Sequence, residues 1–264
     1  MSLASFVEAC DRFPDKLAFG VPTIDTVLPH GIPCGLVTEF CGSFGTGKST
    51  LLLHYAAYSL ENPRVHVIFV DFKKDCYKAR LLPFLRQLPW GCITDYDTEI
   101  ADRVSFYRFT IIDEFNEFLS TDLNKKVAIV RSKDPNAIIL LLIDNIFLPF
   151  KWYVEPHKGE MLNCIRNTGM NLRVLTSDLH LYTVVTNSTI VKLDIDKETR
   201  RLLKEYSVPC LGKPWLDCLD TRILLESDGK VTTAKCVYCW CQGNDQRHTA
   251  QCAFKTGVDC IQTF

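Results

Sequence analysis

The chain has 264 residues, 47% of them hydrophobic and 23% charged, which is typical of a globular protein with one large α/β domain or two small ones. Its net charge of −1 excludes a general attraction to nucleic acid, so any DNA contact must come from a local patch. The longest apolar run, Ala137 to Ile143, is far shorter than the about 20 residues that span a bilayer, so no membrane association is expected. Met1–Ala4 does not resemble the start of a signal peptide, and we expect the 13 cysteines to be reduced thiols of an intracellular protein.

The N-terminal half begins with an arm and then shows a strand followed by a helix. Residues 1–19 carry two short apolar clusters around a charged stretch, and we expect an arm or short helix ahead of the main domain, residues 20–264. A short helix is predicted over Thr23–Leu28, and a Pro/Gly-rich turn follows it. Leu36–Phe40 predicts a buried strand, and Lys48–Leu60 predicts a helix with apolar residues about one turn apart.

Residues 42–49, between that strand and that helix, match the P-loop pattern G-x-x-x-x-G-K-[ST] at every fixed position. Glycines let backbone N–H groups point at a phosphate, and the following helix adds its partial positive charge. Lys48 can reach the β- and γ-phosphates, and the Ser49 hydroxyl can bind Mg²⁺. The alternative is a chance glycine-rich turn. We predict a nucleoside triphosphate site formed by Gly42, Ser43, Phe44, Gly45, Thr46, Gly47, Lys48, Ser49 and Thr50.

Strands and helices alternate through the rest of the chain. Further strands are predicted over Arg64–Val70, Val104–Phe109, Ala137–Ile143 and Leu181–Asn187, with a Lys/Arg-rich helix after the first and an amphipathic helix over Glu114–Val130. Asp144 ends the most apolar strand, and ligands bind at the carboxyl ends of strands in α/β sheets. Asp144 is therefore predicted to hold Mg²⁺ together with Ser49, the alternative being an ordinary aspartate in a turn.

Several of these segments resemble RecA/Rad-type recombinases. The likeness includes Gly20-x-x-x-Ile24-Asp25, Gly31-Ile32-x-x-Gly35, Val37-Thr38-Glu39-Phe40 before the P-loop, Thr186-Asn187 at a strand end, and Leu211-Gly212-Lys213-Pro214-Trp215 as in eukaryotic recombinase paralogues. It covers roughly residues 19–230 and implies a RecA-type P-loop ATPase core, an α/β fold with a mostly parallel sheet flanked by helices, binding ATP and Mg²⁺. The chain before Gly20 is too short for the family's N-terminal helical DNA-binding lobe, and the residues after 230 depart from the family's ending.

The resemblance also identifies a departure at the catalytic position. Where the family has a glutamate that polarises the attacking water, this chain has Lys73, in Asp71-Phe72-Lys73. An ammonium cannot accept a proton from water, so we expect slow or absent ATP hydrolysis, with Asp71 or Asp75 as candidate substitutes. The alternative is a solvated lysine pair with catalysis supplied elsewhere. Arg80 matches the family's arginine against the nucleotide base, an exposed helix arginine being the alternative.

The resemblance implies two DNA-contacting loops, Pro149–Gly159 and Ser188–Ser207. The first carries Lys151 and Lys158 among aromatic residues, a combination that suits single-stranded nucleic acid. The second carries acidic residues and the cations Lys192, Lys197, Arg200 and Arg201, and a solvated helical face is an equal alternative for it. Ser188 stands where active family members have a glutamine that signals between nucleotide and DNA, which argues against a full strand-exchange enzyme.

The two ends of the chain carry one candidate site each. Phe6-Val7-Glu8-Ala9 fits Phe-x-x-Ala, by which recombinases dock onto the next protomer, so Phe6 and Ala9 are predicted partner-binding residues; the alternative is a helix turn packed on its own domain. The Cys-rich tail, about 230–264, contains potential zinc ligands: Cys236, Cys239, Cys241, His248, Cys252 and Cys260. However, residues 235–241 also read as a strand, in which Cys236 and Cys239 would point apart.

The resemblance implies an ATP-binding recombinase paralogue in the nucleus. It would be a subunit of a heteromeric complex, with a recombinase or other paralogues, that promotes or remodels recombinase filaments on single-stranded DNA in homologous recombination repair. Two alternatives stay open. One is a DNA-dependent ATPase that performs strand exchange itself, and the other is a pure interaction subunit with a vestigial nucleotide site.

Overall fold

A parallel sheet forms the centre of the computed structural model, which describes residues 14–28, 31–73, 77–87, 100–151, 158–195, 202–239, 251–256 and 261–263. Its parallel part runs in the order β9-β3-β7-β6-β4-β5, and β10, β11 and β12 continue it antiparallel beyond β9. The strands are β3 (Val37–Gly42), β4 (Val65–Asp71), β5 (Val104–Arg108), β6 (Ile138–Asp144), β7 (Tyr182–Ile195), β9 (Thr221–Ser227), β10 (Thr232–Cys239), β11 (Gln251–Thr256) and β12 (Ile261–Thr263). The predicted mostly parallel α/β sheet is confirmed.

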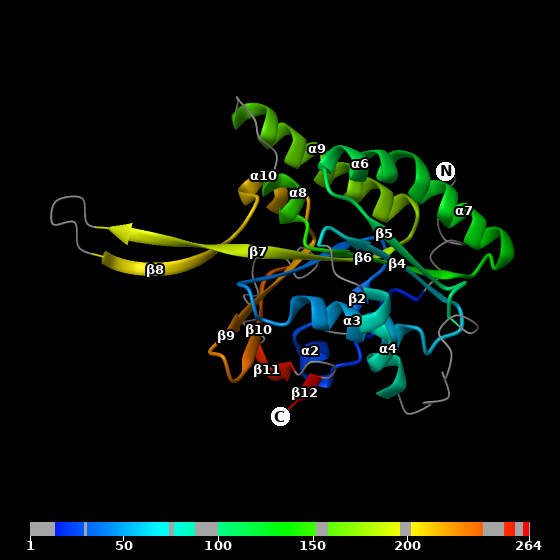
Figure 1. Cartoon of the computed structure of the whole chain (residues 1–264), viewed down its shortest axis with the longest axis horizontal. Helices are drawn as coiled ribbons and strands as arrows, with labels where there is room; N and C mark the ends of the chain where they lie inside the picture. The colour runs from blue at the N-terminus through cyan, green and yellow to red at the C-terminus, as the bar shows by residue number, and fades with distance from the viewer. Residues whose placement is uncertain are drawn as a thin grey trace.

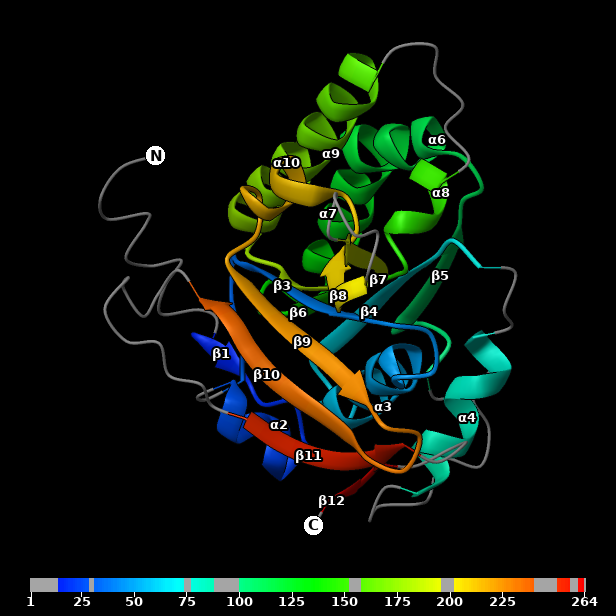
Figure 2. The same cartoon turned by 90° about the vertical axis from the view of Figure 1, so that its left-hand side faces the viewer.

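Helices cover both faces of this sheet (Figures 1 and 2). One face carries α2 (Pro22–Val27), α3 (Lys48–Ser59) and α4 (Tyr77–Gln87), and the other carries α6 (Ile112–Glu117), α7 (Leu123–Lys133), α8 (Phe147–Lys151), α9 (Lys158–Asp178) and α10 (Gly212–Leu216). A π-helical turn, Phe118–Asp122, joins α6 to α7, so the predicted amphipathic segment Glu114–Val130 is helical throughout. No helix in the described residues is long and apolar enough to cross a membrane.

The alternation of side chains along β6 explains how one strand supports two cores. Ile138, Leu140 and Leu142 pack into the cluster on the α2–α3–α4 face. Ile139, Leu141 and Ile143 pack into the cluster under α6, α7 and α9. Every residue of β6 is buried, as expected for a central parallel strand with helices on both sides. The apolar run is therefore a core strand that places Asp144 at the carboxyl edge of the sheet.

The described segment that precedes β3 is attached to this core by backbone hydrogen bonds and by a buried ring. Strand β1 (Lys16–Leu17) pairs with β2 (Ile32–Pro33), and Phe19 is fully buried, with its ring stacked on Tyr55 at a centroid distance of 4.6 Å. The carboxylate of Asp25 accepts hydrogen bonds from the N–H groups of Phe19 at 2.8 Å and Gly20 at 3.1 Å. This contact gives a structural reason for the Gly-x-x-x-Ile-Asp pattern. Phe6 and Ala9 lie outside the described residues.

In the segment 188–207, the described residues form a two-stranded ribbon and not the alternative helical face, while contact with DNA stays a prediction. Strand β7 continues well past Asn187 and pairs antiparallel with β8 (Leu202–Pro209), and the ribbon projects from the body in Figure 1. Thr189, Ile190 and Val191 are β-branched residues, which favour strand over helix. Lys192 and Asp194 on β7 and Lys204 and Glu205 on β8 thus lie on strands. The exposed apolar residues Ile190, Val191, Leu193 and Tyr206 lie on the same two strands.

The Cys-rich tail begins as a strand, as one of the two sequence interpretations predicted. Cys236 in β10 pairs with Ile223 of β9, and Cys252 in β11 is buried opposite Ala234. In the described ranges, no three His, Cys, Asp or Glu side chains are grouped closely enough to hold a metal ion. Cys241, His248 and Cys260 lie outside those ranges, so a zinc site remains a prediction.

Candidate nucleotide-binding site

The P-loop lies where the sequence predicted, between β3 and α3. Gly42 must be a glycine, because a Cβ there would lie 2.6 Å from the carbonyl oxygen of Leu225 on β9. Gly47 caps α3 with φ +81°, a left-handed conformation that residues with a Cβ rarely adopt. Thr46 donates to the Ser43 carbonyl at 2.9 Å, whereas the Phe44 side chain is fully exposed. The loop therefore has the strand–turn–helix context that phosphate binding requires.

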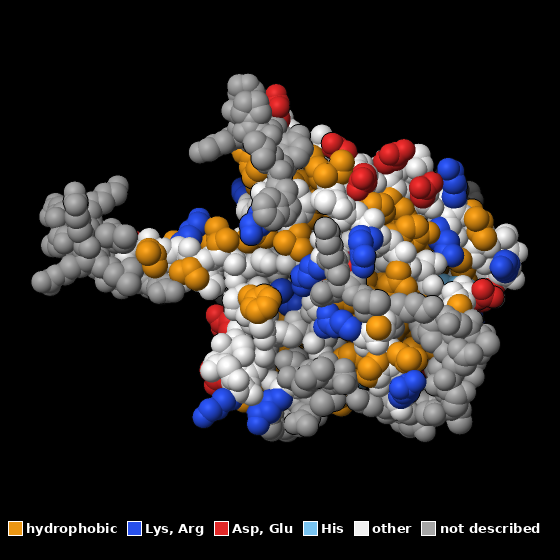
Figure 3. Space-filling model, viewed as in Figure 1, with side chains coloured by type: hydrophobic (Ala, Val, Ile, Leu, Met, Phe, Trp, Pro, Cys, Tyr) orange, Lys and Arg blue, Asp and Glu red, His pale blue; other side chains and the backbone are white. Residues whose placement is uncertain are grey.

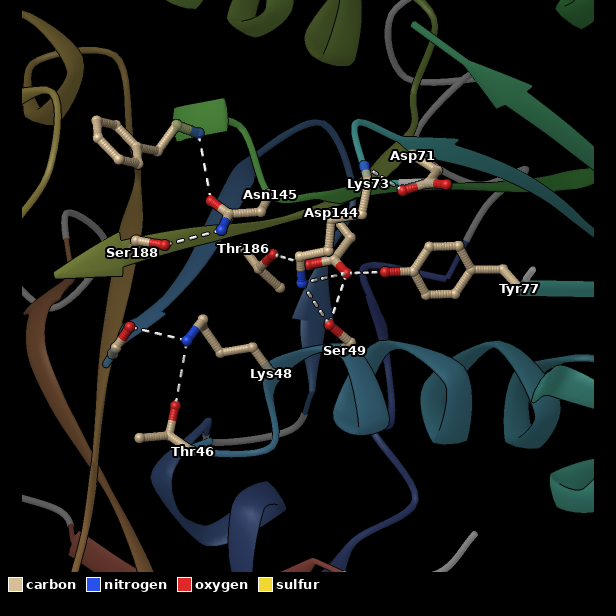
Figure 4. Close-up of polar contacts among 12 residues, drawn as sticks. Thr46, Lys48, Ser49, Asp71, Lys73, Tyr77, Asp144, Asn145, Thr186 and Ser188 are labelled. Carbon is tan, nitrogen blue, oxygen red and sulfur yellow. Dashed lines mark hydrogen bonds and ion pairs between the residues drawn. The ribbon is translucent and has the colours of Figure 1, made fainter. Parts of the chain in front are cut away.

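The Lys48 side chain packs against the P-loop that precedes it. Its Nζ donates to the carbonyl oxygens of Gly42 at 2.8 Å and Ser43 at 2.7 Å, and to the Thr46 hydroxyl at 3.3 Å (Figure 4). The side chain is only 7% exposed. Burial, and next the positive charge of Lys73, lower the pKa of Lys48 to about 8. The ammonium is held where a phosphate bound by the loop could take over its contacts.

Asp144 is the centre of a buried polar cluster at the carboxyl ends of β4 and β6, beside Thr186 of β7 (Figure 4). Its Oδ2 accepts from the Ser49 hydroxyl at 2.6 Å and from the Tyr77 hydroxyl, and its Oδ1 accepts from the Thr186 hydroxyl. Burial alone would raise the pKa of Asp144, but the Lys73 ammonium and these hydroxyl donors outweigh it and hold the pKa below its ordinary value. Asp144 is therefore a carboxylate, as its predicted role with Ser49 requires.

The Lys73 ammonium contacts both residues of the predicted metal site. Its Nζ is 3.0 Å from Ser49 Oγ and 3.3 Å from Asp144 Oδ2, and about a third of its side chain is exposed. The lysine at the catalytic position thus points into the predicted metal site rather than out into solvent. Two unit charges of like sign 4 Å apart repel by about 4 kcal/mol at an effective dielectric constant of about 20, and a divalent ion doubles that. As arranged here, Ser49 and Asp144 do not fit Mg²⁺ while Lys73 remains between them.

Asp71, the candidate substitute for the missing glutamate, has other partners. It is the last residue of β4 and pairs in register with Asp144 of β6. Its Oδ1 accepts the backbone N–H of Lys73 at 2.6 Å, and its Oδ2 lies 3.4 Å from the Arg108 guanidinium on β5. The Asp71 side chain is buried. A role for Asp71 in orienting water remains a prediction, and Asp75 lies outside the described residues.

Strand β7 connects this site to the ribbon. Thr186 contacts Asp144, and two residues later the Ser188 hydroxyl accepts from the Asn145 side-chain amide at 2.8 Å. Ser188 also lies beside Gly42 in the parallel β3–β7 pairing. The position where active family members have a glutamine is therefore within the site, between the P-loop and the start of the ribbon. The serine side chain is too short to extend the contact with Asn145 further along β7 toward the ribbon.

A second buried cluster gathers the residues that carry the family likeness. Glu39 on β3 is fully buried, and its carboxylate pairs with the Arg222 guanidinium on β9. Its Oε1 accepts from the Asn187 amide at 2.9 Å and from the Trp215 indole at 2.7 Å. The motifs Val-Thr-Glu-Phe, Thr-Asn and Leu-Gly-Lys-Pro-Trp thus converge on one carboxylate. This cluster holds β7 and α10 against the strand that leads into the P-loop.

The other predicted contact residues are placed only in part. Arg80 lies on α4, its guanidinium 5.3 Å from the centre of the Tyr77 ring. Lys151 at the end of α8 and Lys192 on β7 are exposed, and Lys158 begins α9. Figure 3, viewed as in Figure 1, shows Lys and Arg side chains near the middle of the molecule and Asp and Glu side chains over α6. Lys197, Arg200 and Arg201 lie outside the described residues, so a contact with nucleotide base or DNA stays a prediction.

Sequence reasoning missed Tyr77, Thr186 and Glu39 as site residues. Thr186 could have been found, because it directly follows the last residue pair of β7 with β6, the strand that ends in Asp144. Tyr77 had no such signal, since it opens a helix after a short connection. Glu39 could have been suspected as a charged residue within an otherwise buried strand.

Comparison with known proteins agrees with this geometry. No protein-family model matches the chain. The chain is 26% identical over 214 residues to DNA repair protein RAD51 homolog 4 of Mus musculus and 24% identical over 215 residues to the protein of the same name of Bos taurus, each over 80% of this chain. It is 35% identical over 86 residues to DNA repair and recombination protein RadA of Haloquadratum walsbyi, over 30% of this chain and 25% of that protein.

The chain spans 60% and 61% of the length of the two RAD51 homolog 4 proteins. The fold described above, a P-loop after a strand of a mostly parallel sheet, is consistent with these similarities. Sequence similarity and fold agree with one another, and both support a recombinase paralogue of the RecA/Rad type.

Proposed function

We propose that this chain is an ATP-binding, hydrolysis-poor subunit of a heteromeric recombinase-paralogue complex. The complex promotes or remodels recombinase filaments on single-stranded DNA during homologous recombination repair in the nucleus. The observation that carries the proposal is the pairing of a complete P-loop with Lys73 on Ser49 and Asp144. A site that keeps its phosphate-binding residues but has a lysine at the expected position of the catalytic glutamate suits a protein that uses nucleotide binding to hold an assembly together.

Two further features support the repair context. The mammalian relatives are named DNA repair proteins, and the archaeal relative is named a DNA repair and recombination protein. The β7–β8 ribbon leaves the same edge of the sheet as the nucleotide site and exposes Lys192 beside apolar residues, a combination that suits backbone and base contacts with single-stranded DNA. Nucleotide at Asp144 and DNA at the ribbon would be coupled through β7.

The rival function is a strand-exchange enzyme in its own right. Lys73 and Ser188 both argue against it. The Lys73 ammonium cannot accept a proton as the expected glutamate does, and the Ser188 side chain is shorter than the expected glutamine. A pure interaction subunit is the other rival, and the arrangement of Lys48 argues against it, since a vestigial loop has no need of a buried lysine.

Phe6→Glu tests the assembly part of this proposal. If Phe6 and Ala9 dock onto a partner, a charge in the partner's apolar pocket should weaken association more than about tenfold, because a hot-spot aromatic carries about 2 kcal/mol or more. The unfolding midpoint of the isolated chain should change little. Affinity for the co-purified recombinase or paralogue subunits is measured by titration, alongside thermal unfolding.

Val7→Glu is the matched control, because it adds the same charge at a position that Phe-x-x-Ala leaves open. Equal losses of affinity for the two variants would contradict a specific docking segment. A large loss of monomer stability with intact association would mean that Phe6 packs on its own domain.

A further inference from the structure

We propose that the Lys73 ammonium is a built-in cation that replaces Mg²⁺ in this nucleotide site, so that the chain binds metal-free nucleoside triphosphate. The inference rests on the proposed nucleotide binding and adds which form of the nucleotide is bound. It starts from a disagreement between the predicted metal site and its geometry. Ser49 and Asp144 are brought together as expected, but a cation from the chain itself is already bound to both.

The hydrogen bonds of Asp144 leave little room for a metal ion. Oδ2 accepts from Ser49, Lys73 and Tyr77, and Oδ1 accepts from Thr186. Mg²⁺ needs nearly octahedral oxygen ligands at about 2.0–2.1 Å and keeps several of its waters. Neither requirement can be met at a fully buried carboxylate with four protein donors around it. For Mg²⁺ to bind Asp144, the Lys73 ammonium would have to leave.

Lys73 is anchored at both ends, which favours its staying. Its backbone N–H donates to Asp71 Oδ1 at 2.6 Å, and Asp71 is itself held by Arg108. Its Nζ then bridges Ser49 Oγ and Asp144 Oδ2, from β4 across to α3 and β6. A flexible lysine with this pair of attachments loses little further freedom when a ligand arrives.

Lys73 would also supply positive charge to the phosphates of a bound nucleotide, as Mg²⁺ does. Lys48 and Lys73 are close enough that the charge of Lys73 lowers the pKa of Lys48. A triphosphate bound by the loop would therefore meet two ammonium groups, one within the P-loop and one on the side where Mg²⁺ is expected. An ammonium can bind phosphate oxygens by its remaining N–H donor, as the metal would bind them by its charge.

The test is a titration of the full chain with a fluorescent ATP analogue, in excess Mg²⁺ and in excess EDTA. For the wild type, we expect affinities that agree within about threefold in the two conditions, because the resident cation is covalently attached. For Lys73→Met, which keeps an unbranched side chain one atom shorter and removes the charge, we expect EDTA to weaken binding more than about tenfold, or about 1.4 kcal/mol, and Mg²⁺ to restore it. Lys230→Met, at an exposed lysine in the β9–β10 turn, is the control and should behave as the wild type.

A wild type that loses more than about tenfold in affinity when EDTA replaces Mg²⁺ would overturn the inference alone, since Lys73 would then give way to the metal. A wild type that binds no nucleotide in either condition would overturn the inference together with the proposed nucleotide binding. The wild-type comparison is decisive without any variant, so poor folding of Lys73→Met would not leave the question open.

Discussion

Lys48→Ala is expected to weaken nucleotide binding by at least about a hundredfold. The ammonium is the one group of the loop that can contact two phosphates at once, and each charge-assisted contact contributes about 1.5–3 kcal/mol. The variant should still fold, because the Lys48 ammonium donates its hydrogen bonds to Gly42, Ser43 and Thr46 of its own loop. Two carbonyls lose a donor, so a stability loss of about 1–2 kcal/mol is expected as well. Calorimetric titration with ATP and denaturant unfolding measure both quantities.

The matched control is Lys230→Ala, which removes an exposed lysine outside the site. It should leave both nucleotide affinity and unfolding unchanged. An unchanged affinity for Lys48→Ala would mean that residues 42–49 are not a phosphate-binding loop. A variant that fails to fold would mean that Lys48 is mainly a structural residue.

Glu39→Gln is expected to destabilise the fold by about 3–5 kcal/mol. It removes one partner of a buried ion pair and leaves the Arg222 guanidinium, whose side chain is 8% exposed, without a counter-charge. Because domains are typically stable by about 5–15 kcal/mol, this is a large part of the total. The amide still offers an oxygen to Asn187 and Trp215, so the loss reports the charge rather than those hydrogen bonds. Urea unfolding at equilibrium measures it.

Glu39→Gln with Arg222→Met separates charge from packing. Removing both charges should recover most of the lost stability, since a buried ion pair adds little beyond what apolar groups of similar size provide. A single variant that costs less than about 1 kcal/mol would contradict the view that the ion pair is desolvated. A double variant as unstable as the single one would indicate that Arg222 has a further structural role.

The parts of the fold that could be predicted are those decided by neighbouring residues. The P-loop is defined by glycines at fixed spacing, and β6 by six consecutive apolar residues that serve two cores. The ribbon was missed because Lys192 and Asp194 obscured the alternation of Val191, Leu193 and Ile195. Charged residues on a projecting strand are equally solvated on a helix, so composition alone cannot distinguish the two.

The site was predictable up to the point where long side chains cross between elements. That Lys73 replaces a glutamate can be read directly from its position after β4. That its Nζ reaches Ser49 and Asp144 depends on the register of β4 with β6 and on four rotatable bonds. The convergence of Glu39, Asn187, Trp215 and Arg222 has the same origin, since residues 39 and 222 become neighbours only through the β3–β9 pairing. Such contacts can be predicted only when the order of the strands in the sheet is known, and no sequence pattern indicated that order.

The most direct test of the account follows the fate of bound ATP in the full chain with its co-purified partners on single-stranded DNA. ATP labelled at the γ-phosphate is bound, and samples quenched over time are analysed for free phosphate. We predict that the complex binds ATP and releases phosphate well below the ordinary enzyme range of ~1–10³ s⁻¹, because Lys73 cannot orient or deprotonate water. Phosphate release within that range, lost in Lys48→Ala, would contradict a binding-only role and favour a strand-exchange ATPase.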